Sequence, residues 1–427
     1  MKRIAFVVLV IASLLLAACG NATADSQTSE DGVVTISFMM WGSPEELDVW
    51  NQVVADFEAQ NPTINVEVDV SDWTSYWEKL NTNFAGGTPP DVFAMDAPLY
   101  MDWVTRDALL NLQPYIDANP TVLDGIYPIT LEAYQLEDGY YGLPRDFQTI
   151  VLFYNEDMFD AAGLPYPDDT WTLETLREVA QQLTLDTNGD GVIDQWGFST
   201  DLWDMELFWS EAIWSYGGEV ISADHTQTLL GEGGAADAWQ FIYDMAITDG
   251  SIPDPDTAGQ FGGDPFDAGV SAMTTIGHWA VPQYATRGFN FDVAPFPAGP
   301  SVRATSVNSA GFVIAAESAH PDEAWQFIQF AIGPTGQTRL AELGFAIPVL
   351  QSIAESPVYL DQAIAINQQV FLDALDYAHP KPVFRGYDQW STEVGDGFYT
   401  VWTGETTLAD ALAQIIPAAD AVLAENQ

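Results

Sequence analysis

Apolar residues follow two alternating spacings along the chain from residue 33 onward. Residues 33–39 are almost continuously apolar, as in a buried strand, and residues 64–70 carry an apolar side chain at nearly every second position. The apolar residues at helical spacing between these segments are Leu47, Trp50, Val54 and Phe57. Ser43 and Glu46 form a capping-box pattern, with Pro44 at the first helical position. The pattern therefore predicts a strand, a helix and a second strand in that order.

The same alternation continues toward the end of the chain. Strand patterns occupy residues 91–96, 149–154 and 309–315, and an apolar helix face covers residues 173–183. Pro321 opens a further helix with two acidic residues in its first turn. A β–α–β–α order is typical of an α/β protein with mostly parallel sheets. At roughly 100–200 residues per domain, the 427 residues predict two such domains.

The N-terminus has the layout of a secretory signal peptide. Lys2 and Arg3 precede an apolar run over residues 4–18, which is too short to span a bilayer. The run ends at Cys19, the single cysteine of the chain, in a Leu-Ala-Ala-Cys-Gly sequence that resembles the lipobox of bacterial lipoproteins. A structural thiol, the alternative, more often lies inside a core.

We therefore expect residues 1–19 to be the signal peptide and lipobox, with a lipid anchor on Cys19. The small polar residues 20–32 are expected to form a flexible tether. The protein would then be exported and held at the outer face of the cell membrane or on its periplasmic side. The membrane would be contacted through this anchor only.

Acidic residues dominate the charge balance, and this excludes several classes of partner. The chain has 62 Asp and Glu but 11 Lys and Arg, which gives a net charge of −51. So few cations cannot neutralise a row of phosphates, so we expect no binding to nucleic acid or to an anionic membrane surface. Aromatic residues make up 13% of the chain, far too many for a disordered acidic tail. The acidity fits a saline or acidic exterior as well as lineage-wide compositional drift.

Four segments of the chain share their pattern with one known family. They are residues 89–93 (Pro-Pro-Asp-Val-Phe), 152–165 (Leu-Phe-Tyr-Asn-Glu-Asp-Met-Phe-Asp-Ala-Ala-Gly-Leu-Pro), 277–280 (Gly-His-Trp-Ala) and 309–312 (Ser-Ala-Gly-Phe) with the helix that follows. In this order they resemble the bacterial extracellular solute-binding proteins of family 1, the carbohydrate receptors of ABC importers and relatives of the maltose-binding protein. The resemblance implies a monomer with the α/β, two-lobed type II periplasmic-binding-protein fold. Each lobe would have a mostly parallel sheet flanked by helices, and the chain would cross a hinge between them.

The resemblance also implies how the chain is divided and what it does. The N-lobe would comprise residues 33–143 plus 304–351, and the C-lobe residues 144–303 plus 352–427. A carbohydrate, either a neutral sugar or an oligosaccharide, would sit between the lobes at the carboxyl ends of strands. Hinge closure would then enclose it and present the closed form to the permease subunits of an importer.

Residues at the mouth of the expected cleft are the first candidates for ligand binding. Trp41 and Glu45 lie just beyond the first strand, and an aromatic ring there can stack on the C–H face of a sugar. The alternative role of Trp41 is a hydrophobic plug over the helix. The resemblance implies a hydroxyl-binding acid at Asp96 and a polar ligand contact at Gln148. The alternative role of Asp96 is a helix N-cap.

Aromatic and basic residues of the C-lobe supply the remaining candidates. Three tryptophans crowd one stretch: Trp203, Trp209 and Trp214. We select Trp209 among them as a stacking platform. Trp279 follows Gly277 closely, which leaves room for a ring to approach, and its alternative is a core position. The resemblance implies a cleft arginine at Arg385. Arg145 is expected to form an interdomain ion pair with its neighbour Asp146.

Residues 186–194 match the oxygen pattern of a calcium-binding loop. The ligands at positions one, three, five, seven and nine would be Asp186, Asn188, Asp190, the Val192 carbonyl and Asp194. The twelfth position, normally a bidentate Glu, is Gly197, so Asp201, Asp204 or Glu206 would have to complete the shell. The alternative is an Asp- and Gly-rich turn without metal. We expect a structural calcium that staples the C-lobe.

An enzyme is the competing functional class, in the form of a secreted glycoside hydrolase with paired carboxylates. With 62 acids, some pair will always lie at a suitable distance, so counting carboxylates does not discriminate. No Gly-x-Ser-x-Gly motif occurs, and the four histidines lack His-Glu-x-x-His spacing. We therefore expect a binding protein without catalytic residues or a catalytic cofactor. A calcium-dependent adhesin is a third possibility, but it would not need two interleaved lobes.

Overall fold

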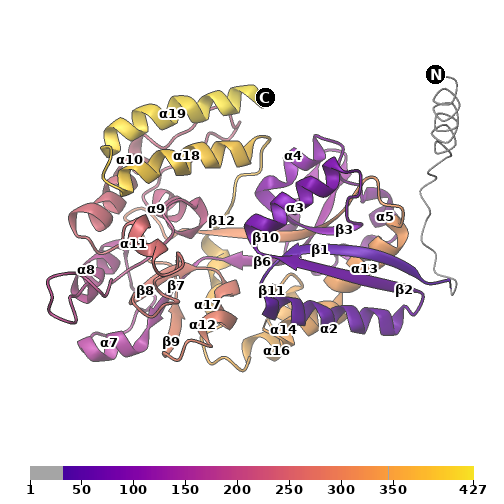
Figure 1. The fold of residues 1–427 in the computed structure, drawn as a ribbon, viewed down its shortest axis with the longest axis horizontal. Helices are drawn as coiled ribbons and strands as arrows, with labels where there is room; N and C mark the ends of the chain where they lie inside the picture. Colours follow the sequence, from indigo (N-terminus) through magenta and orange to yellow (C-terminus); the bar gives the residue numbers. More distant parts are fainter. Residues whose placement is uncertain (1–31, 345) are drawn as a thin grey trace, which may run out of the picture.

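The computed structural model describes residues 32–344 and 346–427 and arranges them as two lobes side by side (Figure 1). The predicted signal peptide, Cys19 and nearly all of the predicted tether lie outside the described residues. Within the part of the chain that is described, no helix is both long enough and apolar enough to cross a membrane.

The first lobe is built on a seven-stranded mixed sheet. Its strands in spatial order are β11 (Ile347–Pro348), β6 (Gly142–Thr149), β10 (Thr305–Ile314), β3 (Val92–Asp96), β1 (Val34–Trp41) and β2 (Ile64–Ser71), and β12 (Ala378–Pro380) pairs with β10. β2, β1 and β3 run parallel, as predicted. β10 runs antiparallel to β3 and β6, because it returns from the second lobe instead of following a crossover helix within this sheet. The sheet is therefore mixed, and the prediction of a mostly parallel sheet is wrong for this lobe.

Helices cover both faces of this sheet (Figure 1). α3 (Trp73–Ala85) and α4 (Tyr100–Val104) lie on one side, and α2 (Pro44–Gln60), α13 (Pro321–Ile332) and α14 (Pro334–Glu342) on the other. α2 begins at the predicted capping box: the Glu46 backbone N–H donates to Ser43 Oγ at 3.2 Å, and Ser43 N–H donates to Glu46 Oε2 at 2.5 Å. The short helices of this lobe are α5 (Gln113–Ala118), α6 (Pro128–Glu132), α15 (Gln351–Ala354) and α16 (Pro357–Leu360).

The second lobe has a three-stranded sheet in the order β8 (Met273–Ile276), β7 (Val151–Asn155) and β9 (Phe291–Ala294). Both pairings are antiparallel, so the prediction of a mostly parallel sheet is wrong for this lobe. α8 (Leu173–Leu183) has the bounds that its apolar face predicts. The other helices of this lobe are α7 (Glu156–Ala162), α9 (Trp209–Ser215), α10 (Gly233–Tyr243), α11 (Pro255–Gly259), α12 (Val281–Tyr284), α18 (Tyr387–Trp402) and α19 (Leu408–Glu425).

The crossings between the lobes lie at different residues from those expected. β6 remains paired with β10 as far as Thr149, so the first sheet continues beyond the predicted boundary at residue 143. α15 and α16 pack against α14, so the first lobe also continues past residue 351. The Thr149 hydroxyl donates to Phe371 O at 2.8 Å, which joins α17 (Gln369–Asp373) to the end of β6. One crossing between the lobes is therefore the direct step from β6 of the first sheet into β7 of the second.

Candidate functional site

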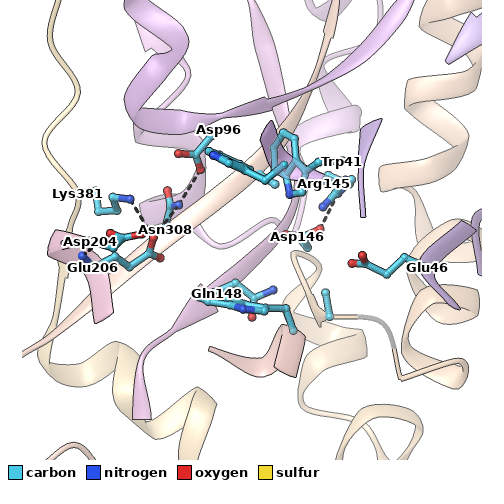
Figure 2. A pocket seen from close by; sticks show the side chains of 14 residues that line it. Trp41, Glu46, Asp96, Arg145, Asp146, Gln148, Asp204, Glu206, Asn308 and Lys381 are labelled. Carbon is cyan, nitrogen blue, oxygen red and sulfur yellow. Dashed lines mark hydrogen bonds and ion pairs between the residues drawn. The ribbon is translucent and has the colours of Figure 1, made fainter. Parts of the chain in front are cut away.

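A cavity of about 380 Å³ lies between the lobes (Figure 2). Most of the side chains that line it are aromatic rings, carboxyl and amide groups, or cations. Its lining residues are Trp41, Glu46, Trp73, Asp96, Arg145, Asp146, Gln148, Asp204, Glu206, Trp279, Asn308, Ala310, Ala346 and Lys381. Strand ends and strand-to-helix turns provide most of them, which is where ligands bind in α/β proteins.

Three tryptophans give the cavity aromatic walls. Trp41 ends β1 and its ring centroid lies 5.0 Å from that of Trp73, at the start of α3. Trp279, in the short helix η5 (His278–Ala280), faces the cavity from the second lobe and is 38% exposed. Its ring packs directly over Gly277, where a Cβ atom would lie 1.9 Å from the ring. Gly277 is thus the residue that permits this ring position.

A buried polar cluster closes one end of the cavity, and Figure 2 shows its members side by side. Lys381 Nζ lies 2.8 Å from Glu206 Oε2. Asn308 Nδ2 donates to Asp96 Oδ1 at 2.7 Å and approaches Glu206 Oε2 at 3.5 Å. Asp96 ends β3 and Asn308 belongs to β10, whereas Glu206 comes from the short helix η3 (Met205–Leu207) and Lys381 follows β12. The cluster therefore ties the two lobes together.

Burial shifts the pKa values of the ionisable groups in this cluster. Burial raises the pKa of Glu206 to about 7, against the opposing effect of the Lys381 ammonium. Burial also raises the pKa of Asp96, which Lys381 and the Asn308 amide partly offset. For Lys381, burial acts to lower the pKa, but the carboxylate of Glu206 and other nearby acidic groups outweigh it and raise the pKa well above its usual value. The ammonium is therefore charged at neutral pH and holds the carboxyl groups in place.

Arg145 and Asp146 form a second ion pair at the cavity, with Nε 2.6 Å from Oδ2. The two residues are neighbours on β6, so the ion pair lies within one strand. It does not join the two lobes, which differs from the expectation of an interdomain pair. The Arg145 guanidinium lies over the Trp41 ring, 5.5 Å from its centroid. Burial raises the pKa of Asp146, and Arg145 opposes this shift. The pair anchors Trp41 at the cavity wall.

Four residues predicted to bind ligand, Trp41, Asp96, Gln148 and Trp279, line the same cavity. Asp96 makes no side-chain cap to the following helix η1 (Ala97–Leu99) and binds Asn308 instead. Gln148 Oε1 is buried and has no hydrogen-bond partner among the described residues. A group of this kind has unused capacity to bind a ligand hydroxyl.

Three predicted ligand residues lie outside the cavity lining. Trp209 is only 2% exposed, and its ring packs 5.2 Å from that of Trp239 in the core of the second lobe. Arg385 is exposed, and Lys381, four residues earlier in the chain, lines the cavity instead. Glu45 is exposed because the capping box directs the next residue, Glu46, back toward the strand end.

The sequence interpretation missed several lining residues. They are Glu46, Trp73, Asp204, Glu206, Asn308 and Lys381, and it gave Arg145 and Asp146 a different role. Lys381 could have been selected from the sequence, because basic residues are rare in this acidic chain and each one is therefore a candidate for a specific role. Trp73 could also have been selected, because it lies just beyond a predicted strand, as Trp41 does.

The predicted calcium loop is a largely exposed turn on the second lobe. Asp186 accepts hydrogen bonds from the backbone N–H groups of Gly189 and Gly191, each at 2.7 Å. Asp194 accepts from Thr187 N–H at 2.8 Å and from the Asn188 amide at 2.9 Å. Across residues 32–344 and 346–427, no group of three or more His, Cys, Asp or Glu side chains is placed to hold a metal ion.

The acids considered for the twelfth ligand position are engaged elsewhere. Asp204 and Glu206 line the cavity, and Asp201 Oδ1 accepts from the backbone N–H of Trp203 at 2.9 Å. Calcium binding by the loop itself stays a prediction.

Known proteins resemble this chain over most of its length. A family model described as bacterial extracellular solute-binding protein matches residues 41–338. The chain is 26% identical over 415 residues to an uncharacterised lipoprotein of Streptomyces antibioticus, covering 94% of this chain and 89% of that protein. It is 24% identical over 428 residues to the galactooligosaccharide-binding protein of Bacillus subtilis, covering 96% and 94%.

Solved structures confirm the two-lobed type II fold. An ABC substrate-binding protein of Listeria monocytogenes in complex with cycloalternan matches with a TM-score of 0.83 at 24% identity, covering 92% of this chain and 98% of that one. The maltose/maltodextrin-binding domain of Bdellovibrio bacteriovorus bound to maltotriose matches with a TM-score of 0.77 at 20% identity, covering 91% and 99%.

Proposed function

This chain belongs to the bacterial extracellular solute-binding proteins, and we propose that it captures a neutral carbohydrate for an ABC importer. The observation that carries the proposal is the cavity between the lobes, where three tryptophans face a cluster of carboxyl and amide groups. Indole rings stack on the C–H faces of sugars, and the polar groups bind hydroxyls. Relatives named for galactooligosaccharide and maltotriose binding support the same ligand class.

The charges at the cavity argue against an anionic ligand. Five carboxyl groups line it, from Glu46, Asp96, Asp146, Asp204 and Glu206. The two lining cations, Arg145 and Lys381, are already paired with Asp146 and Glu206. A phosphate or carboxylate ligand would find no free cation among these lining residues, whereas the hydroxyl groups of a neutral sugar can donate hydrogen bonds to the carboxylates.

Ligand binding would act through the balance between open and closed lobes. Residues of both lobes line the cavity, so a sugar that contacts both binds the closed form more tightly and shifts the population toward it. We infer that the closed form is the one that permease subunits of the importer bind. We further infer that Cys19 carries the lipid that holds the exported protein at the membrane.

We propose that the cavity binds its ligand without cleaving it. Asp96, Asp146 and Glu206 each have an internal partner, in Asn308, Arg145 and Lys381 respectively. A glycoside hydrolase needs one carboxyl group free to donate a proton and a second free to attack or to activate water. Because each of these three carboxyl groups is held by its partner, it is not free to donate a proton, to attack the sugar or to activate water.

The test uses the chain without residues 1–19, titrated by calorimetry with mono-, di- and oligosaccharides, each recovered afterwards for chromatography. Saturable binding of one sugar class, with the sugar recovered intact, is the expected result. Cleavage of the sugar would favour the hydrolase. Tighter binding of sugar phosphates than of their neutral parents would contradict the charge argument.

A further inference from the structure

His278 is a buried polar residue next to one of the aromatic walls of the cavity. It precedes Trp279 in the short helix η5, which follows β8 of the second sheet. Trp279 is partly exposed and lines the cavity, whereas His278 is completely buried. The His278 ring packs against Tyr359 and Phe371, with centroids 5.5 and 5.0 Å away. His278 is therefore closed off from a ligand, and its effect on binding has to pass through its neighbours.

A buried hydrogen bond holds the imidazole. His278 Nε2 lies 2.8 Å from Gln368 Oε1, and Nδ1 is buried without a partner among the described residues. An amide oxygen only accepts hydrogen bonds, so Nε2 carries the hydrogen and donates it. Burial lowers the pKa of His278 to about 4, so at neutral pH the ring is uncharged and its single N–H points to Gln368.

Gln368 continues this chain of hydrogen bonds into the first lobe. Gln368 is buried, and its Nε2 donates to Gln362 Oε1 at 3.2 Å. Gln362 Nε2 donates in turn to Ala341 O, in α14, at 3.0 Å. On the other side, the backbone N–H of Asn367 donates to Asp292 Oδ1, in β9, at 2.8 Å. The segment between α16 and α17 is therefore bonded to both lobes.

We propose that His278 is a positioning residue for sugar binding: its hydrogen bond to Gln368 orients the turn that carries Trp279 and sets that ring relative to the first lobe. This proposal rests on the proposed function. An apolar ring at position 278 would avoid a buried nitrogen without a donor, but only a hydrogen bond fixes the direction of the ring plane. Because His278 and Trp279 are adjacent in one short helix, a rotation of the first displaces the second.

The experiment measures sugar affinity by calorimetry for the chain without residues 1–19, with maltotriose and galacto-oligosaccharides as probes. His278→Phe keeps a ring against Tyr359 and Phe371 but removes the donor, and should weaken binding roughly tenfold. Gln368→Leu removes the acceptor and should weaken binding to the same extent. The double variant should bind as the single variants do, because both substitutions break the same bond. His278→Gln keeps an amide donor on a side chain of similar reach and should restore most of the affinity.

A second background shows whether His278 acts through the Trp279 ring. In Trp279→Ala, the added substitution His278→Phe should cause no further loss of affinity, measured as the rise in melting temperature at high sugar concentration. The same loss in both backgrounds would overturn the positioning role. Full affinity in folded His278→Phe and Gln368→Leu would overturn it as well, while leaving sugar binding intact.

The matched control is Thr228→Val, which removes a buried hydrogen bond of the second lobe away from the cavity lining. Trp390 Nε1 donates to Thr228 Oγ1 at 3.0 Å, and neither residue lines the cavity. Its melting temperature should fall while its sugar affinity stays unchanged. Equal losses of affinity in Thr228→Val and His278→Phe would assign the effect to stability alone and overturn the proposal.

Two further outcomes have a defined meaning. If His278→Phe does not fold, Gln368→Leu decides the proposal by the same criteria, because it breaks the same bond from the other side. Absence of binding of the unmodified chain to every sugar would instead contradict the proposed function, and the role of His278 with it.

Discussion

Trp279 and Trp209 belong to the same lobe and share the same predicted role, but their surroundings differ. Trp279 rests on Gly277 with one face toward the cavity, and 38% of it is exposed. Trp209 is enclosed by the helices of the lobe, and its neighbour Trp239 stacks on Phe398 with 3.7 Å between centroids. A ring is available to a ligand when the protein packs only one of its faces. Sequence position alone does not reveal this.

Two buried carboxyl groups, those of Glu206 and Glu211, differ in the same way: one reaches the cavity and the other does not. Glu206 reaches the cavity and is paired with Lys381. Glu211, on the neighbouring helix α9, is completely buried, accepts from Ser210 Oγ at 3.2 Å and keeps Oε1 without a partner among the described residues. Glu206 therefore reaches the cavity proposed to bind the ligand, whereas Glu211 does not line it.

The largest expected effect is on stability, from Trp209→Ala. Removing a buried aromatic side chain leaves a cavity in the core and costs about 3–5 kcal/mol of unfolding free energy. Denaturant unfolding of the variant and the unmodified chain measures the difference. A loss below about 1 kcal/mol would show that Trp209 is not an integral part of this core.

Trp279→Ala should have the opposite pattern of effects, with a large loss of sugar affinity and little change in stability. We expect roughly a hundredfold loss of sugar affinity, equivalent to about 2.7 kcal/mol, because the ring contributes only at the cavity. Unfolding free energy should change by less than about 0.5–1 kcal/mol, since the ring is partly exposed.

Gly277→Ala is the matched variant for Trp279, because it adds a Cβ beneath the ring and removes no lining side chain. It should weaken binding in the same direction as Trp279→Ala. Unchanged affinity in both variants would remove Trp279 from the binding site.

Glu211→Gln should change how stability depends on pH. Burial raises the pKa of Glu211 to about 8 from a usual value of 4.5, so between these pH values the folded protein binds more protons than the unfolded chain. Stability from this group is then fully present below pH 4.5 and is lost as pH rises toward 8, by about 1.4 kcal/mol per pH unit.

The glutamine variant should lose this slope, so its stability relative to the unmodified chain should increase from pH 5 to pH 8, as unfolding curves across that range would show. Parallel pH profiles for the two proteins would show that Glu211 ionises normally in the folded state.

Local signals in the sequence predicted the elements well, and contacts between distant segments explain the rest. The bounds of α8 and the Ser43–Glu46 capping box depend on residues close together in the chain, so their patterns suffice. The Asn308–Asp96 hydrogen bond joins residues 212 positions apart, and no local pattern marks it. The antiparallel direction of β10 likewise depends on the path of the chain through the second lobe.

The smallest expected effect concerns the acidic loop, whose carboxylates lie at the surface with partners inside their own turn. Hydrogen bonds from the backbone and side chain of Thr187 lower the pKa of Asp194, so the loop keeps this charge for a cation. Calcium that binds only the folded form, at ten times its dissociation constant, would add about 1.4 kcal/mol of stability. Melting temperatures in calcium, in magnesium and in chelator measure this gain, with Asp190→Asn as the variant that should lose it. Equal melting temperatures in millimolar calcium and in chelator would identify the loop as a turn that is stable without metal, because its own backbone already supplies the hydrogen-bond donors that its carboxylates need.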